Sequence, residues 1–109
     1  MLLSNLSKVI TVNKTYNFDK NKHFSAITSN SKFTNNKTLF VYDINTKVKK
    51  IYLDEVLKNK TPAIISNKYI KNLKIPQFVV SNINFEIYYL LTKLHSNPPF
   101  KTIAVTGTN

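Results

Sequence analysis

Short apolar runs of strand length alternate with segments that repeat at helical spacing, and this alternation constrains the fold more than any other feature. The clearest helical segment spans residues 83–94, where the repeating apolar residues are Ile83, Ile87, Leu90, Leu91 and Leu94. At 3.6 residues per turn they form one continuous stripe, which indicates an amphipathic helix. Ser81 or Asn82 can cap its first turn, and the segment 96–99, Ser-Asn-Pro-Pro, ends it.

A second helix is predicted from the apolar residues Tyr52, Leu53, Val56 and Leu57. Asp54 and Glu55 would then fall in its first turn and Lys58 and Lys60 in its last, the arrangement that the helix dipole favours. A shorter amphipathic helix is indicated over residues 2–10 by leucine, valine and isoleucine at helical spacing.

The strand-length runs are residues 24–27, 38–42, 62–66, 77–81 and 101–105. Turn-forming residues occupy 29–38, and residues 11–22 are polar and predict no element. Because helices between strands supply crossovers, we expect an α/β fold: a small, open, largely parallel sheet with flanking helices.

The net charge of +11 in 109 residues raises nucleic acid as a partner. However, all sixteen basic residues are lysines, and they are spread from Lys8 to Lys101. Without arginine the chain lacks the side chain best suited to bidentate phosphate or base contacts. We therefore favour a solvated basic surface and expect no nucleic-acid partner, while a small basic nucleic-acid-binding module stays the alternative and a lysine-lined anion pocket stays open.

Membrane, secretory and metal classes receive no support from the sequence. No stretch approaches the roughly 20 apolar residues of a membrane helix, and the first residues lack the basic and apolar regions of a signal peptide. His23 and His95 have no ligand partners at metal spacing, and cysteine is absent. We expect a cytoplasmic protein with no membrane partner and no metal ligands. Tyr88 and Tyr89 are expected to border the core.

Several segments, in the right order, resemble those of the Mur ligases. Residues 105–109, Val-Thr-Gly-Thr-Asn, are similar to the start of that family's Thr-Gly-Thr-Asn-Gly-Lys-Thr/Ser phosphate loop. Residues 27–32 resemble its Asp-Ser-Arg segment, residues 39–41 match its Leu-Phe-Val-Ala strand, and residues 45–48 resemble a Gly-Thr-Lys-Val piece. The resemblance covers residues 24–109.

The sequence also departs from the family pattern. Asn30 replaces the family aspartate, Lys32 replaces the arginine, and the pair at 36–37 replaces Pro-Gly. The resemblance is closest to the MurE branch, the UDP-N-acetylmuramoyl-tripeptide synthetases, with the MurF branch as the alternative.

The resemblance implies a domain division and a reaction. Residues 1–97 would form the N-terminal UDP-substrate-binding domain. Residues 98–109 would be the first strand and the start of the phosphate loop of an ATP-binding domain that is otherwise missing. The intact enzyme would use ATP and Mg²⁺ to join the third amino acid to UDP-N-acetylmuramoyl-L-alanyl-D-glutamate in peptidoglycan precursor synthesis. The 109-residue fragment alone would be inactive, and its partners would be this UDP-linked dipeptide substrate and the missing central and C-terminal domains.

The resemblance also assigns site residues. The UDP moiety would contact Ser29, Ser31, Thr46, Lys47 and Val48. The incomplete ATP loop would contain Gly107, Thr108 and Asn109. No catalytic residue is assigned. Without the resemblance, Ser31 fits a turn-capping hydroxyl and Lys47 a solvated basic loop, and a nonbinding remnant of the family is a further reading.

Overall fold

A six-stranded sheet organises the molecule, seen in a computed structural model that describes residues 1–45, 50–94 and 101–104. The strands are β1 (Lys14–Tyr16), β2 (Ala26–Thr28), β3 (Thr38–Tyr42), β4 (Ala63–Ser66), β5 (Gln77–Val79) and β6 (Lys101–Ala104). Their order is β1-β5-β4-β3-β2-β6. Strands β2 to β6 run parallel, and β1 pairs antiparallel with β5. The expected α/β class with a largely parallel sheet is confirmed.

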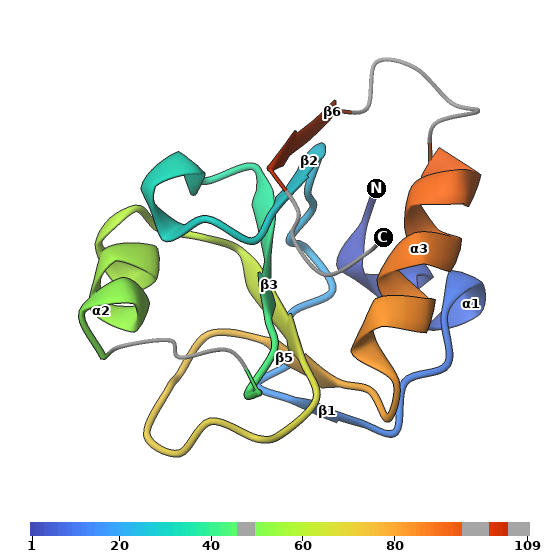
Figure 1. The fold of residues 1–109 in the computed structure, drawn as a ribbon, viewed down its shortest axis with the longest axis horizontal. Helices are drawn as coiled ribbons and strands as arrows, with labels where there is room; N and C mark the ends of the chain where they lie inside the picture. The colour runs from blue at the N-terminus through green and yellow to red at the C-terminus, as the bar shows by residue number, and fades with distance from the viewer. Residues whose placement is uncertain (46–49, 95–100, 105–109) are drawn as a thin grey trace.

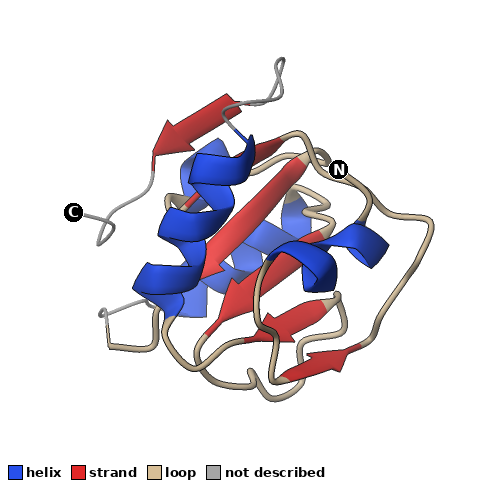
Figure 2. Cartoon of the chain, turned by 90° about the vertical axis from the view of Figure 1, so that its right-hand side faces the viewer, coloured by secondary structure: helices blue, strands red, loops and turns tan. Residues whose placement is uncertain are grey.

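Helical elements cover both faces of this sheet. They are the 3₁₀ turns η1 (Leu3–Asn5) and η2 (Ser31–Phe33) and the helices α1 (Leu6–Val9), α2 (Lys50–Lys58) and α3 (Ile83–Leu94). Figure 1 shows α2 and η2 on one face and α1 and α3 on the other. In the view of Figure 2, α3 crosses in front of the strands. The result is a three-layer arrangement with the sheet in the middle.

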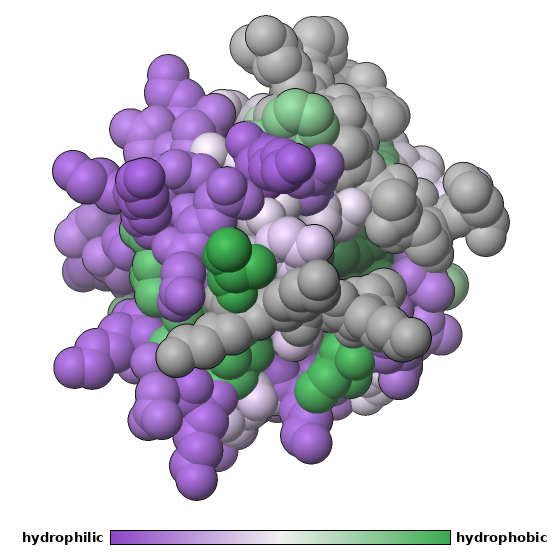
Figure 3. Space-filling model, turned by 60° about the vertical axis from the view of Figure 1, so that its left-hand side comes forward, coloured by the Kyte–Doolittle hydropathy of each residue, from purple (hydrophilic) through white to green (hydrophobic). Residues whose placement is uncertain are grey.

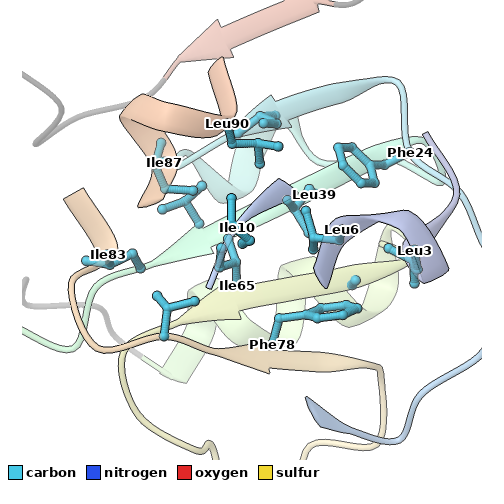
Figure 4. Packing of buried hydrophobic residues seen from close by; sticks show 14 of the residues in the cluster. Leu3, Leu6, Ile10, Phe24, Leu39, Ile65, Phe78, Ile83, Ile87 and Leu90 are labelled. Atoms are coloured by element: carbon cyan, nitrogen blue, oxygen red, sulfur yellow. The ribbon is translucent and has the colours of Figure 1, made fainter. Parts of the chain in front are cut away.

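The main core lies between the sheet and the layer of α1 and α3. Alternate strand residues point to opposite faces, so Leu39 and Val41 join this core while Phe40 packs on the other side with Val56 of α2. Figure 4 shows side chains of η1, α1 and α3 closing over the strands. The core residues labelled there are Leu3, Leu6, Ile10, Phe24, Leu39, Ile65, Phe78, Ile83, Ile87 and Leu90.

Helix α3 matches its prediction in both bounds and orientation. Its buried face includes Ile83, Ile87, Leu90 and Leu94. The Asn82 side-chain oxygen accepts a hydrogen bond from the Phe85 backbone N–H at 3.1 Å, so Asn82 is the cap. The strand predicted at 38–42 is β3, with the same bounds.

Several expectations need correction. Helix α2 begins at Lys50, so Asp54 and Glu55 lie beyond its first turn. Tyr88 and Tyr89 do not border the core: their exposed fractions are 61% and 40%. The helix expected over residues 2–10 is a 3₁₀ turn followed by the four-residue α1. The polar stretch before residue 22 contains β1.

Two of the parallel connections contain no α-helix. The chain passes from β2 to β3 through η2, and from β4 to β5 through the loop 67–76. The buried Gln77 side chain holds that loop, because it accepts from the Ile70 N–H at 2.8 Å and donates to the carbonyls of Ile70 and Leu73, each at 3.0 Å. These hydrogen bonds satisfy the buried amide, and Leu73 of the loop packs in the cluster that contains Phe40, Val56 and Ile64.

The strand expected at 101–105 is β6, and it extends the same sheet by pairing with β2. The division of the chain at residue 97 stays a prediction. None of the helices in the described residues has the length and the apolar composition that a membrane span requires.

Candidate functional site

The order of the strands reverses at β2, and this reversal indicates where a ligand site can form. From β2 the chain adds β3, β4 and β5 successively on one side, and then β6 pairs on the other side of β2. In open α/β sheets, ligands bind outside the carboxyl ends of the strands at such a reversal. Thr28, the last residue of β2, is paired with Ala104, the last residue of β6. The residues that follow Thr28 are therefore the starting point of the candidate site.

The turn after β2 is fixed by its own side chains. The Thr28 hydroxyl oxygen accepts from the Asn30 N–H at 3.0 Å. The Asn30 side chain then accepts from the Lys32 N–H at 3.0 Å and caps η2. Ser29 lies half-buried between them. The Asn30 side chain thus supplies the oxygen that caps the first turn of η2.

Ser31 is buried, and its hydroxyl donates to Oε1 of Glu55 in α2 at 2.6 Å. A second polar link runs parallel to it: Asn59 donates to the Thr34 hydroxyl at 3.0 Å, and that hydroxyl donates to the Ser31 carbonyl at 2.6 Å. These bonds fasten η2 to α2. Because a serine hydroxyl has a single hydrogen, Ser31 Oγ is left with lone pairs only and can accept but not donate further.

Glu55 is the residue of this site that the sequence reasoning missed. Its position on a helix made it a candidate for a dipole-stabilising charge, and its partner lies 24 residues away in the chain. The spacing of residues within a helix gives no indication of a contact with a residue so far away in the sequence.

An open groove of about 330 Å³ lies between η2 and α2. Its lining residues are Lys32, Ile51, Tyr52, Asp54, Glu55 and Lys58. Figure 3 shows the side of the molecule that carries α2, where the surface is largely hydrophilic with separate hydrophobic patches. Ile51, which lines the groove, is 66% exposed. The lining of the groove therefore contains both apolar surface and charged groups, namely two lysines and two carboxylates.

Thr46, Lys47 and Val48 lie outside the described residues, but the chain on either side of them is placed. Before them, Asp43 Oδ1 accepts from the Asn67 side chain at 2.8 Å and from the Asn45 N–H at 2.9 Å. Asn67 in turn accepts from the Ile44 N–H at 2.8 Å. After them, α2 begins, and its residues 51 and 52 line the groove. The described residues before the predicted loop thus form an anchored turn after β3, and those after it belong to the helix that lines the groove.

Gly107, Thr108 and Asn109 also lie outside the described residues, as does His95. Among the residues that are described, no cluster of three or more histidine, cysteine or acidic side chains is placed to hold a metal ion. His23 forms an isolated backbone bridge with Leu2.

Neither a scan against protein-family models nor a search of curated proteins gives a significant match to this chain.

Proposed function

We propose that this chain is the UDP-binding part of an ATP-dependent Mur ligase of the MurE type. One observation carries the proposal: the turn that contains Ser29 and Ser31 packs against α2, the helix to which the predicted loop 46–48 leads. The groove between these elements is lined by Lys32 of η2 and by Ile51 and Tyr52 of α2, the first described residues to line it after the loop 46–48.

The groove chemistry suits a UDP group. The Ser31 hydroxyl is buried and is not among the groove's lining residues, so the turn 29–31 would contribute to UDP binding by holding η2 against α2. Lys32 and Lys58 line the groove together with the carboxylates of Asp54 and Glu55, and the two lysine ammonium groups can form charge-assisted bonds with phosphate oxygens. Lys47 would add a third cation. The apolar part of the wall suits the flat face of a base.

In the intact enzyme, ATP would phosphorylate the peptide carboxylate of UDP-N-acetylmuramoyl-L-alanyl-D-glutamate, and the amine of the incoming amino acid would displace the phosphate. Mg²⁺ would accompany ATP. The central and C-terminal domains would be the partners of the present domain, the cytoplasm its location, and peptidoglycan synthesis its role. Neither a membrane nor nucleic acid is part of this proposal.

An NMR titration of the 109-residue chain with UDP tests the proposal. We expect amide shifts at Ser29, Ser31 and Tyr52 that saturate with UDP. Pyrophosphate, which has no base, should shift these amides less, and ADP should leave them unchanged. Equal shifts of these amides with ADP and UDP would overturn the uridine assignment, and an absence of saturable shifts with UDP would overturn the site.

A further inference from the structure

A second groove lies away from the one between η2 and α2, and the two share no lining residue. Its volume is about 510 Å³, within the range of small-ligand sites. The lining residues are Asn17, Phe18, Asp19, Lys20, Lys22, Lys74 and Pro76. They come from two stretches, one following β1 and one preceding β5, so the groove exists only in the folded chain.

Both walls of this groove are fixed in place. Asn17 adopts a left-handed backbone conformation, with φ of 54°. Its side chain donates to the carbonyls of Leu73 at 3.1 Å and Ile75 at 3.3 Å, which ties the first wall to the second. Asp19 Oδ1 accepts from the Asn21 N–H at 2.9 Å and closes the turn that carries the lysines. A preformed site costs little ordering entropy when a ligand binds.

The groove presents a flat apolar ring beside positive charge. Phe18 is 51% exposed, and its ring meets the buried Phe78 at 6.5 Å between centroids in an edge-to-face contact. The charged residues of the lining are three lysines, Lys20, Lys22 and Lys74, and one acidic residue, Asp19, so positive charge is in excess. No salt bridge engages these three lysines within the part of the chain that the structure describes.

We propose that this groove binds a free nucleotide, with the base stacked on Phe18 and the phosphates bound by the three lysines. Aromatic side chains stack on planar rings of any base, and lysine ammonium groups form charge-assisted bonds with phosphate. The site therefore selects for a ring joined to phosphate and not for one base. The limited size of the groove favours one nucleotide over a nucleic-acid strand. The inference does not depend on the function proposed above.

Calorimetric and NMR titrations with ADP test this site. ADP should bind saturably and shift the amides of Phe18, Lys22 and Lys74. Pyrophosphate, which has no ring, and adenosine, which has no phosphate, should each bind more weakly. Lys74→Gln should weaken ADP binding about tenfold, the effect of losing one charge-assisted hydrogen bond. Phe18→Leu, which keeps an apolar cover over Phe78 but no flat ring, should weaken it about fivefold.

Lys8→Gln is the matched control, because it removes the same charge from an exposed position in α1. An equal loss of affinity in Lys8→Gln and Lys74→Gln would overturn the site in favour of general charge attraction. Tighter binding of a ten-residue oligothymidylate, with shifts spread beyond the groove, would overturn it in favour of a nucleic-acid surface. UDP shifts at Ser31 should persist in Lys74→Gln, so the result for this groove is separable from the result for the proposed function.

Discussion

The hydrogen bond between Ser31 and Glu55 is the best-defined contact of the candidate site, and it makes a prediction about stability. Glu55→Ala removes the acceptor and leaves a buried hydroxyl unpaired, which should cost about 1–3 kcal/mol of unfolding free energy. Glu55→Gln keeps an acceptor oxygen in place and should cost clearly less. Urea unfolding measures the difference. Asp54→Ala, at an exposed neighbouring position, is the control and should stay within about 0.5 kcal/mol of the unchanged protein. Equal losses in the two Glu55 variants would show that the bond is not what holds η2 to α2.

Thr61 offers a stabilising substitution. Its hydroxyl is buried and has no hydrogen-bond partner among the described residues. Replacing an unpaired buried hydroxyl by a methyl group of the same shape removes a desolvation cost, so Thr61→Val should raise the unfolding free energy by about 1 kcal/mol. Thr28→Val is the opposite case, because the Thr28 hydroxyl accepts from the Asn30 N–H and its loss should destabilise the protein. Urea midpoints that move in the same direction for both variants would contradict this reasoning.

Among the elements, α3 shows why a helical stripe is predictable and its edges are not. The predicted apolar stripe faces the core, but the polar residue Glu86 is also buried in the structure, whereas Tyr88 is exposed. The Glu86 carboxylate can be buried because its Oε1 accepts from the Thr11 N–H at 3.2 Å, and that donor is 75 residues away. We expect Leu90→Ala to cost about 2–5 kcal/mol and Tyr88→Ala less than about 0.5 kcal/mol by urea unfolding. Comparable losses would place Tyr88 in the core after all.

The elements that the sequence predicted poorly share a physical cause. Strand β1 has three residues, Lys-Thr-Tyr, and gains its strand conformation from pairing with β5, a partner more than 60 residues away. Strands β3 and β4 were predictable because each is buried on both faces and appears as an apolar run. Of the candidate site, the turn after β2 could be predicted, because its hydrogen bonds join residues close in the sequence. The contribution of Glu55 could not be predicted, because it depends on the packing of α2 on η2.

For the whole molecule, the net charge of +11 is the dominant electrostatic fact. Like charges on a folded chain repel one another and oppose compaction. The molecule extends 34 × 31 × 25 Å, and the Debye length is about 30 Å at 0.01 M salt but about 10 Å at 0.1 M. At low salt most lysines therefore repel one another across the molecule, and at 0.1 M salt mainly near neighbours do.

Raising NaCl from 0.01 M to 0.1 M should accordingly increase the urea midpoint, because screening relieves repulsion more in the compact state than in the expanded one. Choline chloride at the same ionic strength should give the same increase, since screening does not depend on the identity of the cation. Pyrophosphate at matched ionic strength should stabilise further, because a ligand that binds the folded state adds to the screening effect. Lys74→Gln should reduce the additional stabilisation by pyrophosphate but not the increase of the urea midpoint with NaCl. Lys8→Gln should change neither effect. A urea midpoint that does not move with NaCl would mean that the lysines are too far apart, or too well solvated, for their repulsion to influence folding.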